Sequence, residues 1–205
     1  MKRIGIIGGT FDPIHYGHLI LAEQARVEAS LDKVIFMPAM VQPFKLNNKI
    51  AEGDDRYEMV RKAIAGNPYF SVSRMELDRE EISYTIHTLN ECRAKFGANA
   101  ELYFIMGTDA FLSLEQWYAA KDLLKGFSFV IGTRPGYKEQ ERRALIDRLR
   151  GRYGTNMIEI NNSEVEISST DIKSRIKEGK SIKYLLPEPV EEYIFRNKLY
   201  QDQPL

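Results

Sequence analysis

The fold of this chain is decided by the stretch Gly8-Gly9-Thr10-Phe11-Asp12-Pro13-Ile14-His15-Tyr16-Gly17-His18. An apolar run at residues 4–7 precedes it and predicts a buried strand, and residues 19–25 after it predict a helix. Paired glycines let the backbone approach a ligand closely, because they carry no Cβ. The first N–H groups of a helix have no partner inside the helix and attract anions. The stretch therefore predicts a phosphate-binding turn between a strand and a helix.

Two histidines mark the start of this predicted helix. His15 and His18 are three residues apart and share a face if the turn is helical, and Gly17 between them leaves room for a bulky group. A helix start is a poor place for cationic imidazoles unless an anion binds there, which disfavours the interpretation as two unrelated polar residues. Two histidines without a nearby cysteine or third histidine are too few for a closed zinc site. Contact with phosphate is the favoured interpretation.

Composition excludes several classes of protein. The 205 residues are 43% hydrophobic and 28% charged, which is ordinary for a globular domain. The 29 basic residues are balanced by 29 acidic ones, which argues against a general nucleic-acid-binding protein. The single cysteine cannot form an internal disulfide, and no apolar run approaches the roughly 20 residues of a membrane span. Because no signal-peptide pattern is present either, we expect a cytoplasmic protein without nucleic-acid or membrane partners.

Strand and helix patterns alternate along the chain, with further apolar runs at residues 34–37, 70–73, 102–106, 127–131 and 157–160. This alternation predicts an α/β fold: a Rossmann-like doubly wound parallel sheet with helices on both faces. We expect one domain over residues 1–205, with a small C-terminal helical part at about 168–200. The charged residues 76–81 predict a connection on the surface. Gly107-Thr108-Asp109 follows a buried strand, as the first glycines do, so both turns are expected at the same edge of the sheet.

The first stretch, taken with a second one, is similar to a known family. Residues 8–18 resemble the signature of the H-x-G-H nucleotidyltransferase superfamily, and Ile167-Ser168-Ser169-Thr170-Asp171-Ile172-Lys173 resembles its second motif, I-S-S-T-x-I-R. The order and separation of the motifs, with a length near 200, resemble bacterial nicotinate-nucleotide adenylyltransferases. The resemblance extends over essentially the whole chain. One departure is Lys173, which stands where the family commonly has arginine; lysine keeps the charge but loses the bidentate fork.

This resemblance implies transfer of AMP from ATP to nicotinate mononucleotide, giving nicotinate adenine dinucleotide and pyrophosphate, with Mg²⁺ accompanying the ATP. It implies a catalytic role for His15 and His18. It also implies a set of residues that bind ATP: Gly8, Gly9, Thr10, Phe11, His15, His18, Gly107, Asp109, Ser168, Ser169, Thr170 and Lys173. An ordinary helix cap is the alternative for Ser168, Ser169 and Thr170, and for Asp109 as well.

Nicotinate mononucleotide would need an aromatic surface and hydrogen-bond donors. Trp117, the only tryptophan, is expected to stack on the cationic pyridinium, with a core aromatic as the alternative. Thr85 and Tyr118 are expected to supply donors to the carboxylate. Lys45 is expected to neutralise phosphate, with a solvated surface lysine as the alternative. Other functions stay open: a relative that uses nicotinamide mononucleotide or phosphopantetheine as acceptor, or a non-catalytic ATP-binding module. A homo-oligomer also stays open.

Overall fold

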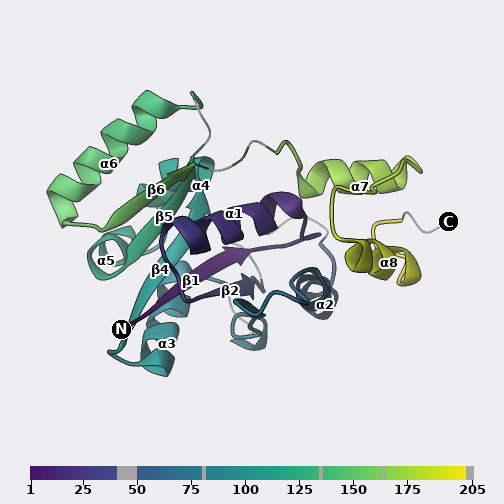
Figure 1. Ribbon diagram of the computed structural model, residues 1–205, viewed down its shortest axis with the longest axis horizontal. Helices are drawn as coiled ribbons and strands as arrows, with labels where there is room; N and C mark the ends of the chain where they lie inside the picture. The colour runs from purple at the N-terminus through teal and green to yellow at the C-terminus, as the bar shows by residue number, and fades with distance from the viewer. Residues whose placement is uncertain (41–49, 80–81, 134–135, 162, 164, 202–205) are drawn as a thin grey trace.

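A six-stranded parallel sheet forms the centre of the molecule in a computed structural model that describes residues 1–40, 50–79, 82–133, 136–161, 163 and 165–201 (Figure 1). The strands lie in the order β3-β2-β1-β4-β5-β6, and every neighbouring pair is parallel. The chain winds outward from β1 in one direction and from β4 in the other. The predicted doubly wound α/β fold is thus confirmed.

The strands match the apolar runs of the sequence: β1 (Lys2–Gly9), β2 (Lys33–Pro38), β3 (Phe70–Val72), β4 (Ala100–Gly107), β5 (Ser128–Thr133) and β6 (Met157–Asn161). The helices are α1 (Tyr16–Glu28), α2 (Gly53–Ala63), α3 (Thr85–Phe96), α4 (Thr108–Leu112), α5 (Ala120–Gly126), α6 (Glu139–Tyr153), α7 (Ser169–Lys177) and α8 (Glu188–Arg196). Two short 3₁₀ turns lie at η1 (Leu77–Arg79) and η2 (Leu114–Gln116).

Helices cover both faces of the sheet because alternate residues of each strand point to opposite faces. Ile7 of β1 and Ile105 of β4 belong to the core under α1, α2, α7 and α8. Ile6 and Phe104 belong to the core under α3, α4, α5 and α6. α1 lies in front of the sheet in Figure 1. The molecule therefore has one core on each side of a shared sheet.

Two local expectations differ from the structure. Gly8 and Gly9 are the last residues of β1, paired with Met37 and Pro38 of β2, so the turn itself begins only after them. Residues 76–81 were expected on the surface, yet Glu76 and Leu77 are buried. Leu77 packs against the site that a Cβ on Gly53 would occupy, so this connection is held against α2.

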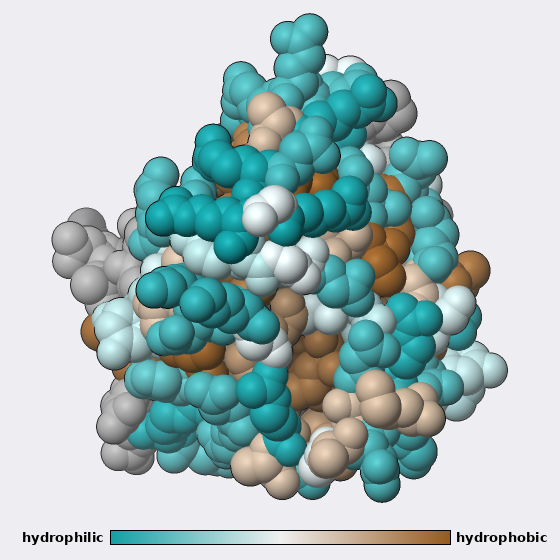
Figure 2. Space-filling model, turned by 90° about the vertical axis from the view of Figure 1, so that its left-hand side faces the viewer, coloured by the Kyte–Doolittle hydropathy of each residue, from teal (hydrophilic) through white to brown (hydrophobic). Residues whose placement is uncertain are grey.

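The outer surface is hydrophilic over much of the side that carries α5 and α6 (Figure 2). Hydrophobic residues appear there in separate patches between hydrophilic ones. α6 shows the reason, because its Leu145, Ile146 and Leu149 are buried while most of its charged side chains are exposed. Within the described part of the chain, no helix is long and apolar enough to cross a membrane.

Candidate active site

A cavity of about 680 Å³ opens at the carboxyl ends of β1 and β4. These adjacent strands lead into α1 and α4 respectively, and the order of strands in the sheet reverses between them. Ligands of doubly wound sheets bind at such a switch point. The two predicted glycine turns meet here, since Gly8, Gly9 and Gly107 all line the cavity.

The two histidines lie at the N-terminus of α1. His15 is the N-cap residue and His18 is in the first turn, and their rings stack with centroids 3.8 Å apart. The backbone N–H of His15 donates to Nδ1 of His18 at 3.3 Å. A neutral His18 imidazole whose Nδ1 accepts this bond carries its proton on Nε2. His18 lines the cavity, whereas His15 is buried behind it.

Gly17 makes this pairing of rings compatible with the helix start. A Cβ at Gly17 would lie 3.0 Å from Cε1 and Nδ1 of His15, closer than most real Cβ contacts, so the ring would have to shift. The bulky group for which Gly17 leaves room is therefore the ring of His15. Phe11, which was expected to bind ATP, has a buried side chain whose ring meets that of His18 edge-on, with centroids 5.1 Å apart. Phe11 supports the histidine from the core side.

Burial sets the charge of His15. Desolvation lowers the pKa of His15 to about 4, so its imidazole is neutral near pH 7. A bound phosphate would act in the opposite direction, because nearby negative charge favours the cation. The site therefore has one buried neutral imidazole and one imidazole facing the cavity, at the positive end of a helix dipole.

The residues expected to bind the nicotinate moiety line the same cavity. Thr85 is the first residue of α3, and Trp117 and Tyr118 follow η2. Trp117 is half-buried, edge-on to Phe104, and its Nε1 donates to Oγ of Ser113 at 3.2 Å. Tyr118 is exposed and its ring lies 4.4 Å from that of Tyr84. The structure thus brings an aromatic surface and the start of α3 to the cavity that His18 also lines.

Sequence reasoning missed much of the cavity wall. Glu76 is the main omission: it is buried and lines the cavity, and Oγ of Thr88 donates to its Oε1 at 2.6 Å. Burial raises the pKa of the Glu76 carboxyl. No local pattern identifies such a residue, because its run of sequence is charged. The other residues not predicted are Ile7, Leu21, Ala39, Ser83, Tyr84, Phe104, Ile105, Met106, Ala110, Ser113 and Gln116. Of these, Ile7 and residues 104–106 were predictable from the carboxyl ends of the two strands.

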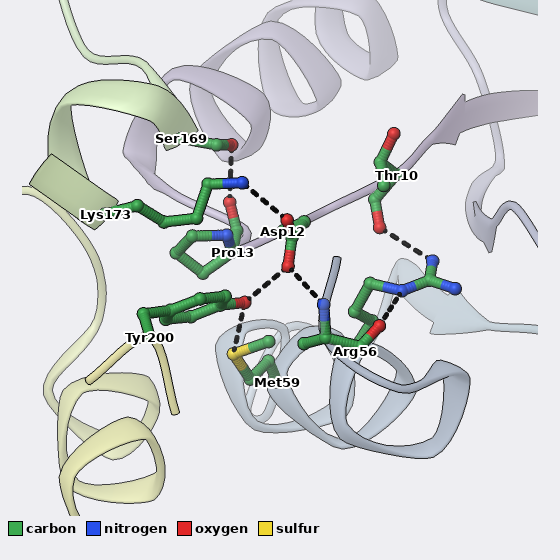
Figure 3. Close-up of polar contacts among 9 residues, drawn as sticks. Thr10, Asp12, Pro13, Arg56, Met59, Ser169, Lys173 and Tyr200 are labelled. Atoms are coloured by element: carbon green, nitrogen blue, oxygen red, sulfur yellow. Dashed lines mark hydrogen bonds and ion pairs between the residues drawn. The ribbon is translucent and has the colours of Figure 1, made fainter. Parts of the chain in front are cut away.

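The second motif, residues 167–173, lies beside the turn at residues 10–13 and does not line the cavity. Ser168 is the N-cap of α7, and its Oγ accepts a hydrogen bond from the N–H of Asp171 at 3.0 Å. Oγ of Ser169 donates to the carbonyl oxygen of Pro13 at 2.8 Å, across 156 positions of sequence (Figure 3). Thr170 is exposed. The capping alternative is therefore realised for Ser168, and phosphate contact by this motif remains a prediction.

Three further predicted residues, Lys173, Asp109 and Thr10, are not among those that line the cavity. Lys173 forms an ion pair with Asp12, with Nζ 2.7 Å from Oδ2. Asp109, in the first turn of α4, accepts hydrogen bonds from Tyr137 at 2.9 Å and Lys138 at 3.0 Å. Thr10 is buried directly after β1. Lys45 lies outside the described residues.

Metal binding by side chains alone finds no support in the described ranges. No three His, Cys, Asp or Glu side chains gather there as ligands for an ion. A hard cation such as Mg²⁺ needs oxygen ligands and commonly takes them from substrate phosphates and water. The side chains present are therefore compatible with a cation that is bound mainly by the phosphates of a nucleotide.

Comparison with known proteins agrees with this geometry. The model of the cytidylyltransferase-like family matches residues 6–175. A protein of Moorella thermoacetica, named as a probable nicotinate-nucleotide adenylyltransferase, is 48% identical over 97% of this chain and 92% of its own length. One from Thermoanaerobacter sp. with the same name is 46% identical over 97% of this chain and 94% of its own.

The fold is shared with solved structures. The nicotinic acid mononucleotide adenylyltransferase of Plasmodium falciparum, complexed with NaAD, superposes with a TM-score of 0.81 at 19% identity, over 98% of both chains. The same enzyme complexed with APC gives a TM-score of 0.77 at 20% identity. At such identities the likeness concerns the fold. With the full-length relatives and the family model, it leads to one conclusion: this chain is a member of the cytidylyltransferase-like family, within the nicotinate-nucleotide adenylyltransferases.

Proposed function

We propose that this chain transfers AMP from ATP to nicotinate mononucleotide, giving nicotinate adenine dinucleotide and pyrophosphate. One observation carries the proposal: the same cavity is lined by His18 at the start of α1 and by Thr85, Trp117 and Tyr118. The first group suits a phosphate chain, and the second suits a cationic aromatic ring with a carboxylate. Both substrates of the reaction can therefore meet at one place.

The reaction asks little covalent chemistry of the protein. An oxygen of the acceptor phosphate attacks the α-phosphorus of ATP, the bond from that phosphorus to the bridging oxygen of the β-phosphate breaks, and pyrophosphate leaves. The nucleophile is already anionic, so no protein base is required. Positioning of two anions and stabilisation of charge supply the catalysis. His18 would donate a hydrogen bond to the phosphates from Nε2, while the dipole of α1 attracts their charge.

The other predicted phosphate contacts belong to the same proposal. The N-terminus of α7, with Ser168, Ser169 and Thr170, lies beside the turn at Pro13, where it can approach the β- and γ-phosphates. Mg²⁺ would bind chiefly phosphate oxygens and water, and would offset charge on the leaving pyrophosphate. We propose a cytoplasmic location for the reaction, and leave the oligomeric state open.

Specificity for the acid would arise around Thr85. Thr85 lines the cavity and is the first residue of α3, where the N–H groups have no partner inside the helix, and charge-assisted bonds to a carboxylate are stronger than bonds to an amide. Loss of such a bond costs about 10- to 100-fold in kcat/KM. Nicotinamide mononucleotide should therefore be a poorer acceptor by that factor.

The test is pyrophosphate release from ATP and Mg²⁺ with nicotinate mononucleotide, nicotinamide mononucleotide or phosphopantetheine as acceptor. We expect release with the first acceptor and much slower release with the others. His18→Ala should slow turnover by about 100-fold or more in a protein that circular dichroism shows to be folded. ATP binding without pyrophosphate release by any acceptor would instead identify a non-catalytic module.

A further inference from the structure

The turn between β1 and α1, residues 10–13, contains a buried carboxylate that is held by groups from three distant parts of the chain (Figure 3). Asp12 is 3% exposed. Its Oδ2 is paired with Nζ of Lys173 at 2.7 Å, and its Oδ1 accepts bonds from Tyr200 Oη at 2.8 Å and from the N–H of Ala51 at 3.0 Å. A buried carboxylate with this many donors has a fixed position, because releasing it would leave a buried charge unpaired.

Tyr200 reaches Asp12 through an unusual piece of backbone. After α8 the N–H of Leu199 bonds to Ile194 O at 2.9 Å, and the N–H of Lys198 bonds to Phe195 O, which reverses the chain. Lys198 and Tyr200 both have left-handed backbone conformations, with φ of 53° and 63°. Residues with a Cβ rarely adopt this conformation, so tertiary contacts must hold it in place. The contacts of the Tyr200 side chain are the evident ones.

Tyr200 contacts both members of the Asp12–Lys173 ion pair. Its hydroxyl donates to Asp12, and its ring lies 5.9 Å from Nζ of Lys173, within the range of a cation–π contact. Sδ of Met59 lies 4.0 Å from the same hydroxyl. Tyr200 therefore closes the cluster on the side of the C-terminus.

The rest of the turn is held in the same manner. Arg56 is 1% exposed, and its guanidinium donates to the carbonyl oxygens of Thr10 at 2.9 Å and Ala39 at 2.6 Å. Ser169 donates to Pro13 O. Every one of these contacts ends on residues 10–13 or on the chain beside them, directly before His15. The position of both imidazoles depends on this turn.

We propose that Tyr200 is a positioning residue for the phosphate-binding turn, acting through Asp12. This inference rests on the proposed adenylyl transfer. The Tyr200 hydroxyl and Lys173 together fix the Asp12 carboxylate. The carboxylate in turn fixes residues 10–13, and these residues position the histidines against the triphosphate. Lys173, which stands where the family commonly has arginine, then acts by orienting Asp12 in addition to any contact with phosphate.

The chain offers a matched control. Tyr193 Oη donates to Oδ1 of Asp55 at 2.8 Å, so it also joins the C-terminal part to α2 by a tyrosine–aspartate bond. Among the described residues, the Tyr193 hydroxyl bonds to Asp55 and not to residues 10–13. Tyr200→Phe and Tyr193→Phe each remove one hydroxyl and keep the ring. If Tyr200 only docked the C-terminal part, Tyr200→Phe and Tyr193→Phe would have the same consequences.

The experiment compares the two variants by steady-state kinetics and by hydrogen exchange of residues 10–18 measured by mass spectrometry. We expect Tyr200→Phe to raise KM for ATP about tenfold, with KM for nicotinate mononucleotide within twofold of the wild type. Exchange in residues 10–18 should be faster. Tyr193→Phe should change neither, although both variants should lower the urea midpoint. Asp12→Asn should reproduce the faster exchange, which keeps the test decisive if Tyr200→Phe does not fold.

Equal effects of the two variants on KM for ATP and on exchange would overturn the inference. Faster exchange in Tyr200→Phe with an unchanged KM for ATP would overturn it as well, because the turn would then move without consequence for the nucleotide. Failure of the proposed function is distinguishable, since it shows as no pyrophosphate release by the wild type. In that case the KM for ATP is replaced by its dissociation constant from calorimetry, and the exchange comparison is unaffected.

Discussion

At the scale of single residues, His15 shows how burial decides chemistry. Its imidazole is neutral near pH 7 because desolvation lowers its pKa from 6.5 to about 4. Tyr200 shows the complementary case, since burial and the charge of Asp12 raise the pKa of its phenol. The phenol therefore remains a hydrogen-bond donor throughout the physiological range.

His15 should make the stability of the fold depend on pH. Between about pH 6.5 and pH 4 the unfolded chain binds a proton at this residue and the folded chain does not, so stability falls as the pH falls through this window. The full effect is about 3 kcal/mol. The test is urea unfolding of the wild type and of His15→Gln at pH 7, 6, 5 and 4.5. Between pH 7 and pH 4.5 the variant should lose less unfolding free energy than the wild type, by up to that amount. Identical pH dependence in both proteins would contradict the burial of a neutral imidazole.

Trp117 should report directly on the acceptor. It is the only tryptophan, and it lines the cavity half-buried. A pyridinium stacked on indole accepts electron density from it, so binding should quench the emission. Titration with nicotinate mononucleotide should lower the fluorescence, and titration with ATP alone should change it little. Trp117→Phe should raise KM for the mononucleotide severalfold and leave KM for ATP unchanged. Quenching by ATP but not by the mononucleotide would place the two substrates the other way round.

At the scale of elements, α7 combines a cap with a contact to the first turn. Ser168 caps the helix, while Ser169 donates to Pro13 O. Ser168→Ala should lower the free energy of unfolding by about 1 kcal/mol, as the loss of an N-cap does. Ser169→Ala is the paired variant and should lower it by a similar amount, because one hydrogen bond is lost.

The kinetic effects of the two variants test the predicted phosphate contacts. If Ser168 also binds phosphate, Ser168→Ala will raise KM for ATP. The loss of the helix cap alone lowers the free energy of unfolding and leaves KM for ATP unchanged as long as the protein stays folded. Urea midpoints and KM for ATP, measured on the same preparations, separate the two contributions. An unchanged KM for ATP in both variants would reduce this part of the second motif to a structural cap.

At the scale of the whole molecule, we propose that residues 1–205 unfold as one domain. Ile172 of α7 and Ile194 of α8 belong to the same buried core as Ile7 of β1 and Met59 of α2. A core shared between the sheet and the C-terminal part should make unfolding cooperative.

Ile194→Ala tests this cooperativity. Ile194 is fully buried, so the variant should lose about 2–5 kcal/mol of unfolding free energy. Circular dichroism reports on all helices, whereas Trp117 fluorescence reports on the opposite side of the sheet. Both should give the same lowered urea midpoint. Phe195→Ala, at a position 44% exposed, should have a much smaller effect. A Trp117 transition that does not move in Ile194→Ala would show that the C-terminal part unfolds separately.

The sequence by itself determined the strands, the helices and the parallel sheet, because hydrophobic periodicity and helix caps depend on neighbours along the chain. It also predicted that the first glycine turn and Gly107 would meet, since the carboxyl ends of parallel strands share one edge. Thr85 and Trp117 follow from no such rule, and were expected at the site from the resemblance and from the chemistry of the acceptor. Local pattern could not place Glu76, whose charged surroundings predicted a surface connection.

Only the tertiary structure decided how Asp12 is held. Its partners Lys173 and Tyr200 are 161 and 188 positions away, and no periodicity links residues at such separations. Their meeting requires α7 to dock beside the first turn and the chain after α8 to reverse through left-handed backbone at Lys198. These are properties of packing, where a buried charge selects the few arrangements that supply it with donors.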